Sequence, residues 1–176
     1  MNNSSSRLAP LRICVVRLSA LGDVLMCLPA IRQIQDAFPH ASITWVISDF
    51  AYQLVEGIDD INFIVIKKPK GIRDYWSFYR RMRSHRFDVL LAMQASFRAN
   101  LLYPCIRATR TIGYDRLRAK DGHFLFINES ISAGHDHTLE GFLKFSQALG
   151  APKQALRWDL VLDSPTQANI AQFLPD

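Results

Sequence analysis

The sequence predicts an α/β fold, a doubly wound and mostly parallel Rossmann-like sheet with helices on both faces. Short apolar runs alternate along the chain with segments of helical periodicity, and apolar runs of this kind are typical of strands covered on both sides. Such an alternation implies right-handed crossovers between parallel strands. With 176 residues, 49% of them apolar, the chain is long enough for one buried core and short for two.

Most of the expected strands are short apolar runs. The first covers residues 11–16 (LRICVV), and its nearly continuous apolar character predicts a strand in the middle of the sheet. Three further apolar runs predict strands at residues 42–47, 61–66 and 87–93, and a short strand is expected at 109–113.

The clearest helix is expected at residues 22–38, where apolar side chains recur at three- and four-residue spacing. Pro29 lies inside it, has no N–H, and should kink the helix or mark the end of its first turn. Further helices are expected at residues 52–56, 72–85, 97–106 and 137–149, the last one stopped by Gly150. The tail predicts a terminal strand at 156–162 and a polar helical piece at 165–173.

Composition argues against several classes of protein. The segment before Leu11 has no apolar core of a signal peptide, and no run of eighteen apolar residues follows, so we expect a cytoplasmic protein. Cys14, Cys27 and Cys105 lie in apolar surroundings without metal-ligand spacing, which favours reduced thiols in the core. His135 and His137 flank Asp136 before a helix and are interpreted as a polar cap region.

Positive charge is concentrated in one segment. The chain has 21 Lys and Arg against 16 Asp and Glu, and residues 67–86 contain eight basic residues with Asp74 as the only acid. A cluster of this kind binds nucleic acid, an anionic membrane surface or an acidic substrate, or it is simply a solvated helix face. The composition leaves these alternatives open.

The loop after the first strand, residues 17–23, is the first candidate site, because ligands of parallel sheets bind outside the carboxyl ends of the strands. Gly22 permits a close backbone approach, and Asp23 is a carboxylate at a helix start. Asp23 either caps the helix or takes a proton from a substrate hydroxyl. The fingerprints GxGxxG and GxxxxGK[ST] are both missing, so ordinary dinucleotide or ATP binding is not expected.

Three segments of the sequence resemble the lipopolysaccharide heptosyltransferases, bacterial glycosyltransferases of family 9 with the GT-B fold. The most specific is RLSALGDVLMCLPAIRQI, which follows the first strand; FDVLLAMQASFRANLL and TIGYDRLRAKDGHFLFIN continue the resemblance. One departure is Ala92-Met93-Gln94, where the family commonly has an acidic or amide residue before the glutamine. The resemblance covers roughly residues 11–150.

The resemblance implies the N-terminal half of a GT-B enzyme. Residues 11–162 would be the Rossmann-like domain on the acceptor side, and 163–176 would begin the linker to a C-terminal donor-binding domain that lies outside this chain. The donor would be ADP-heptose, and the reaction would be inverting, with Asp23 as the base and Ser19 and Gly22 near the donor phosphates. No metal or cofactor is expected, because helix dipoles and basic side chains can stabilise a departing diphosphate.

The implied acceptor is the anionic inner core attached to lipid A, which basic side chains can bind. The candidate acceptor contacts follow the third, fourth and fifth strands: Lys67, Lys70, Arg73, Gln94, Arg98 and Arg116. Four arginines further along the basic helix are expected to be solvated or to face the inner-leaflet membrane surface, where the enzyme would be peripheral: Arg80, Arg81, Arg83 and Arg86.

Two rival functions remain. The basic segment, with Tyr75, Trp76 and Tyr79 as stacking platforms, could define a nucleic-acid-binding domain. Since these aromatic residues share a helical face with Ile72, we expect them instead in the core or in the wall of an acceptor cleft, and we expect no nucleic-acid partner. The other rival is a non-catalytic flavodoxin-like binding module, in which Asp23 is only a cap.

Overall fold

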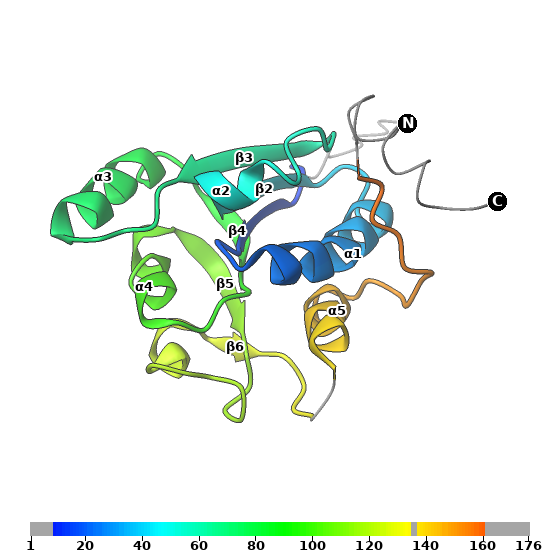
Figure 1. Ribbon diagram of the computed structural model, residues 1–176. Helices are drawn as coiled ribbons and strands as arrows, with labels where there is room; N and C mark the ends of the chain where they lie inside the picture. Colours follow the sequence, from blue (N-terminus) through cyan, green and yellow to red (C-terminus); the bar gives the residue numbers. More distant parts are fainter. Residues whose placement is uncertain (1–8, 135–136, 161–176) are drawn as a thin grey trace, which may run out of the picture.

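The computed structural model describes residues 9–134 and 137–160 and has a six-stranded, entirely parallel sheet (Figure 1). The strand order is β3-β2-β1-β4-β5-β6. The strands are β1 Arg12–Val16, β2 Ser42–Ser48, β3 Ile61–Ile66, β4 Phe87–Ala92, β5 Ala108–Gly113 and β6 Glu129–Ser130. The predicted doubly wound parallel sheet is confirmed, and β1 lies in its middle.

Helices cover both faces of the sheet (Figure 1). On one face lie α1 Leu21–Ala37, the short α2 Asp49–Tyr52 and α5 Thr138–Ala148. On the other lie α3 Ile72–Met82, α4 Phe97–Asn100 and two 3₁₀ turns, η1 Tyr103–Cys105 and η2 His123–Phe126. Within the described residues no helix combines the length and the apolar character that a membrane span requires.

Alternation along the central strand builds two cores at once. In β1, Ile13 and Val15 face the α1 side, whereas Cys14 and Val16 face the α3 side. All four are fully buried, which explains why the strand reads as a continuous apolar run rather than an alternating one. Each side chain of this size contributes roughly 1.5–3 kcal/mol by burial.

Helix α1 continues through Pro29 instead of ending there. A proline at this position leaves the carbonyl of Leu25, four residues earlier, without its helical N–H donor. The indole Nε1 of Trp158 donates to that carbonyl at 2.8 Å. A side chain from the segment after α5 therefore replaces the hydrogen bond that the proline removes.

Three expected elements differ from the structure. The helix expected at 52–56 lies earlier, as α2, because Ser48 Oγ accepts a hydrogen bond from the Ala51 amide and caps its start. The helix expected at 97–106 is split into α4 and η1, with Pro104 in the second. Residues 156–160 form no strand; they run along α1, held by Trp158 and Arg157. The rest of the expected terminal strand and the expected linker lie outside the described residues.

Candidate functional site

The order of the strands places a crevice between β1 and β4. From β1 the chain winds outward through β2 and β3, then returns to the other side of β1 as β4. Parallel sheets bind ligands at such a switch point, outside the carboxyl ends of the strands. The loops that meet there are residues 17–20 after β1 and residues 93–96 after β4.

Arg17, directly after β1, is buried although it is charged, with only 8% of its surface exposed. Its Nη1 donates to the carbonyl of Met93 at 2.7 Å, and Nη2 donates to Asp23 Oδ2. The guanidinium carbon lies 5.1 Å from the centre of the Phe142 ring, a cation–π geometry. Arg17 thus joins the β1 loop, the β4 loop and α5 at the crevice.

Asp23 is the third residue of α1, and its side chain is 30% exposed. The residue before the helix is Ala20, which has no side-chain oxygen, and Asp23 Oδ2 accepts from the Ala20 amide at 3.3 Å. Both hydrogen bonds of the carboxylate go to Oδ2, and Oδ1 meets no hydrogen-bond donor among the described residues. The geometry combines a helix-capping role with a partly exposed carboxylate oxygen at the crevice.

Gln94 connects the two loops. Its Oε1 accepts a hydrogen bond from the Leu18 amide at 2.7 Å, and its carbonyl accepts from the Tyr103 hydroxyl at 2.5 Å. Tyr114 adds a third connection, because its hydroxyl donates to the Met93 carbonyl at 3.0 Å. Gln94 therefore holds the crevice together, and only its amide nitrogen is left for a ligand.

A hollow of about 300 Å³ opens beside this crevice. Its walls come from the loops after β1, β3 and β4: Leu18, Ser19, Lys68, Pro69, Gln94, Ser96, Phe97 and Arg98. Three residues predicted from sequence, Ser19, Gln94 and Arg98, meet here. Lys68 and Arg98 give it positive charge, which suits an anionic ligand.

The other predicted acceptor residues lie outside this hollow. Lys67 lines a separate hollow of about 250 Å³ with Asp74 and Arg81. Lys70 and Arg73 are exposed where the chain enters α3, and Arg116 is exposed after β5. They follow strand ends at the same edge of the sheet, but none of them lines the hollow beside the crevice.

His123 belongs to a buried polar network. Its Nε2 accepts from the Tyr114 amide at 3.2 Å, so the proton is assigned to Nδ1, which faces Asn100 Oδ1 at 2.8 Å. Burial lowers the pKa of His123 to about 4, and the neutral ring suits this role. Gly113 is required beside it, since a Cβ there would lie 2.4 Å from His123 Nε2.

The remaining reactive side chains have structural surroundings. Cys14 and Cys27 are buried and unpaired, and burial raises the pKa of Cys27 to about 12, so its thiol is a poor nucleophile. His137 caps α5 by accepting from the Leu139 amide at 3.3 Å, as predicted, whereas His135 lies outside the described residues. The described part of the chain contains no cluster of three or more His, Cys, Asp or Glu side chains that could hold a metal ion.

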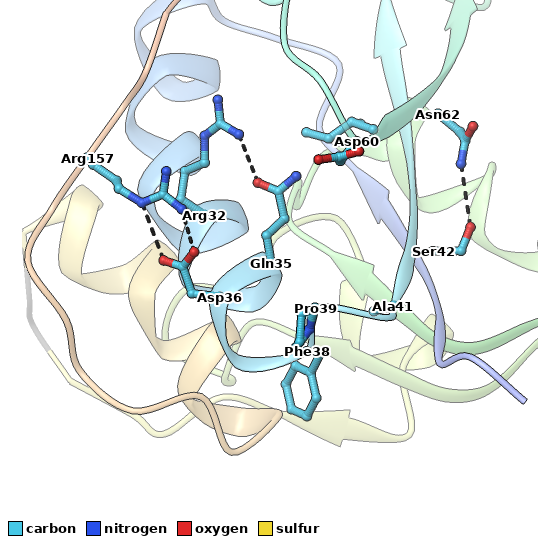
Figure 2. Close-up of a pocket in the computed structure, with 11 residues that line it drawn as sticks. Arg32, Gln35, Asp36, Phe38, Pro39, Ala41, Ser42, Asp60, Asn62 and Arg157 are labelled. Atoms are coloured by element: carbon cyan, nitrogen blue, oxygen red, sulfur yellow. Dashed lines mark hydrogen bonds and ion pairs between the residues drawn. The ribbon is translucent and has the colours of Figure 1, made fainter. Parts of the chain in front are cut away.

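A larger hollow, about 740 Å³, lies at the opposite edge of the sheet (Figure 2). It is formed where β2 and β3 begin, beside the end of α1. Both of its arginines already have partners: Arg157 pairs with Asp36, and Arg32 donates to Gln35 Oε1 at 3.0 Å. Because the amino ends of parallel strands are not where such sheets bind ligands, we place the candidate site at the smaller, basic hollow.

Arg17 is the site residue that the sequence did not reveal. Its position after a buried strand was visible, but its partner Met93 lies 76 residues away. Phe97 likewise enters the site only through the meeting of the loops after β3 and β4.

Comparisons with known proteins agree on one group. The profile of glycosyltransferase family 9 (heptosyltransferase) matches residues 75–175. Over 167 residues the chain is 33% identical to the lipopolysaccharide core heptosyltransferase OpsX of Haemophilus influenzae, covering 94% of this chain and 48% of that protein.

Solved structures show the same fold at lower identity. E. coli heptosyltransferase WaaC, determined with ADP-2-deoxy-2-fluoro heptose, superimposes with a TM-score of 0.73 at 22% identity, over 85% of this chain and 52% of that one. A family 9 glycosyl transferase from Veillonella parvula gives 0.72 at 22% identity, over 94% and 50%. This chain therefore spans about half the length of the proteins that it matches.

Proposed function

This chain belongs to glycosyltransferase family 9 (heptosyltransferase), and we propose on that basis that the full-length protein is an inverting glycosyltransferase of lipopolysaccharide core synthesis. The donor is ADP-heptose and the acceptor is a sugar of the inner core. One observation supports this most directly: Asp23 lies at the switch-point crevice, with one oxygen held by Arg17 and Ala20 and the other without a donor among the described residues.

In the proposed reaction Asp23 is the general base. The acceptor hydroxyl oxygen attacks the anomeric carbon of the heptose and its proton passes to Asp23. The bond between the anomeric carbon and the diphosphate oxygen breaks, and its electron pair leaves with ADP. Arg17 holds the carboxylate in one orientation, which is the positioning that such a proton transfer requires.

The diphosphate needs positive potential as it departs. The N-terminus of the seventeen-residue helix α1, with Ser19 and Gly22 beside it, supplies backbone N–H groups and the positive end of a helix dipole. We propose that these groups act without a metal ion or other cofactor, and that a donor-binding domain completes the site.

The acceptor side is the basic hollow. Lys68 and Arg98 line it, and the amide nitrogen of Gln94 is left for a ligand. Four further basic residues are exposed after strands that end at the same edge of the sheet: Lys67, Lys70, Arg73 and Arg116. Phosphates and carboxylates of an inner-core sugar match these side chains. Because this acceptor is attached to lipid A, we place the enzyme in the cytoplasm, peripheral on the inner face of the inner membrane, with no nucleic-acid partner.

The test is heptose transfer from ADP-heptose to an inner-core acceptor by the full-length protein, with Asp23 intact and with Asp23→Asn. Asparagine keeps the size of the side chain and can still accept the Arg17 and Ala20 hydrogen bonds, but it cannot take the proton. We expect kcat to fall at least about 10²-fold in a protein that is still folded at the assay temperature, although its thermal unfolding midpoint should be lower because Arg17 then lacks a charged partner. Equal turnover in both proteins would reduce Asp23 to a helix cap.

A further inference from the structure

Helix α3 has two different faces. Phe78 and Met82 are buried against the sheet, and Tyr75 is half-buried beside them. On the other side Ile72 is 83% exposed and Trp76 is 61% exposed. Trp76 was expected in the core or in the wall of an acceptor cleft; it does not pack in the core, because Phe78 and Met82 occupy the inward face.

Ile72 and Trp76 lie one helical turn apart and form a continuous apolar strip. The Trp76 ring contacts the Tyr79 ring, with their centres 5.6 Å apart, which extends the strip by a further turn. Large apolar side chains placed next to one another on a surface indicate an interaction site more strongly than single ones do.

Three arginines share this outward face. At 3.6 residues per turn, Arg73, Arg80 and Arg83 fall with Ile72 and Trp76 inside an arc of roughly 100°. All three are exposed, and none makes an ion pair with the described residues. The one acid of α3, Asp74, lies away from this arc and accepts hydrogen bonds from the amides of Lys70 and Gly71 at 2.7 and 3.2 Å.

We propose that this face of α3 docks on an anionic lipid bilayer. Ile72 and Trp76 would enter the boundary between headgroups and acyl chains, where Trp is favoured, and Arg73, Arg80 and Arg83 would bind the phosphates. The face carries no acid, so its charge complements anionic headgroups along its whole length.

The proposal rests on the proposed function for its purpose and extends it. Helix α3 adjoins the acceptor hollow, because the Tyr75 hydroxyl donates to the carbonyl of Arg98 at 3.3 Å and Arg98 lines that hollow. A protein docked through α3 would hold the basic hollow close to the bilayer in which a lipid-linked acceptor is anchored.

The test is binding of the chain to vesicles of phosphatidylethanolamine and phosphatidylglycerol at 3:1, with pure phosphatidylcholine vesicles for comparison. Co-sedimentation measures binding, and tryptophan fluorescence reports where it occurs, since Trp45 is buried and Trp158 is half-buried. We expect binding to the anionic vesicles alone, with a blue shift of the emission that is lost in Trp76→Phe.

Variants separate the apolar and ionic contributions. Replacing Ile72 and Trp76 together by Ser should weaken binding about tenfold or more, and Arg80→Glu with Arg83→Glu should weaken it more than about twentyfold. Phe50→Ser and Arg107→Glu are the matched controls. The Phe50 side chain is 64% exposed on α2, across the sheet from α3, and Arg107 is exposed just before β5. Both variants should bind the vesicles as the parent chain does.

Unchanged vesicle binding in the Ile72/Trp76 double variant would overturn the proposal. The proposal would also be overturned if the chain bound a single-stranded oligonucleotide of twenty thymidines more tightly than the anionic vesicles, because Trp76 would then serve as a stacking platform for bases. Transfer to a water-soluble acceptor fragment distinguishes the two proposals: loss of membrane docking leaves that reaction intact, whereas failure of the proposed function abolishes it in every variant.

Discussion

A buried arginine beside a partly exposed aspartate is the central feature of the crevice. The guanidinium of Arg17 is shielded by Phe142 and held by the Met93 carbonyl, so it cannot turn away to solvent. The pair of Arg17 and Asp23 is therefore more than an ordinary surface ion pair, because the β1 loop, the β4 loop and α5 together fix the position of the guanidinium. Asp23 takes its orientation from this fixed cation.

We predict that Arg17→Met lowers the free energy of unfolding by about 2–4 kcal/mol, because it removes a buried, hydrogen-bonded cation and leaves the Met93 carbonyl with the Tyr114 hydroxyl as its remaining side-chain donor. In the full-length protein it should also lower kcat for transfer while leaving the KM for ADP-heptose nearly unchanged. Arg17→Lys should retain part of the stability and part of kcat, since it keeps the positive charge. Chemical denaturation and steady-state kinetics measure the two effects.

Arg110→Met is the matched control for this prediction. Arg110 also pairs with a carboxylate, Glu129, at 2.7 Å, but both side chains are more than 40% exposed. Its loss should cost less than about 1 kcal/mol and should leave kcat unchanged. If Arg17→Met lowers the free energy of unfolding and kcat no more than Arg110→Met does, Arg17 does not hold Asp23 in place as we infer.

His123 makes stability depend on pH. Burial lowers its pKa to about 4 in the folded state, against about 6.5 in an unfolded chain. The unfolded state therefore binds more protons between these values, and the free energy of unfolding must fall as the pH is lowered from 6.5 toward 4. The loss from this one group should reach up to about 3 kcal/mol.

Urea denaturation at a series of pH values tests this, with His123→Phe for comparison. The variant loses the hydrogen bonds to Tyr114 and Asn100 and should be less stable near pH 7, but its curve should fall less steeply between pH 6.5 and 4. Parallel curves for the two proteins would contradict a buried neutral histidine.

The sequence allowed Asp23, Gln94 and Arg98 to be placed at the carboxyl edge, because each follows a clear apolar strand. It did not reveal what holds them. The hydrogen bonds of Arg17 to Met93 and of Leu18 to Gln94 each span 76 residues, and no local pattern encodes a contact at that separation.

At the scale of the elements, burial decided which features were predictable. The strands from β1 to β5 were placed within one residue at each end, and β1, β2 and β4 were the clearest, since a strand covered on both faces is apolar over most of its length. Element β6 has two residues and leaves no such signature. The segment at 156–160 has strand-like composition, but its tryptophan and arginine contact α1 instead of pairing with the sheet.

Pro29 and Trp158 should be energetically coupled. Trp158→Phe removes the donor to the Leu25 carbonyl and should cost about 1–2 kcal/mol in the parent chain. In Pro29→Ala, the amide of residue 29 can donate to the same carbonyl, so the cost of Trp158→Phe should fall. A double-mutant cycle from urea denaturation measures this difference, and we expect a coupling of at least about 0.5 kcal/mol.

Additive effects of the two substitutions would mean that Trp158 stabilises the chain only by packing. The matched control is Pro39→Ala: Pro39 lies after α1 ends and removes no helical hydrogen bond, so it should show no coupling to Trp158.

For the whole molecule, the fold class followed from the alternation of strands and helices, but the order of the strands did not. Reading along the chain cannot tell whether β4 pairs with β3 or with β1. Only the second arrangement creates the switch point that brings Arg17 and Met93 together. The site is thus a property of the topology, with the residues supplied by two loops.

The two ends of the sheet should respond differently to salt. If the carboxyl edge binds the anionic acceptor, affinity for a soluble, phosphorylated inner-core fragment should fall at least threefold between about 0.05 and 0.3 M NaCl, because exposed charges are screened beyond roughly 10 Å at 0.1 M. Titration calorimetry on this chain measures it. Lys68→Ala and Arg98→Ala should each weaken binding and reduce the salt dependence, since both line the hollow.

Arg157→Ala provides the matched control at the other end. Arg157 lines the larger hollow, where it already pairs with Asp36, so its removal should leave both the affinity and its salt dependence unchanged (Figure 2). Salt-independent binding, or weaker binding in Arg157→Ala alone, would move the acceptor away from the basic edge. The acceptor would then bind in the larger hollow at the amino ends of the strands, contrary to the general preference of parallel sheets for ligands at the carboxyl ends.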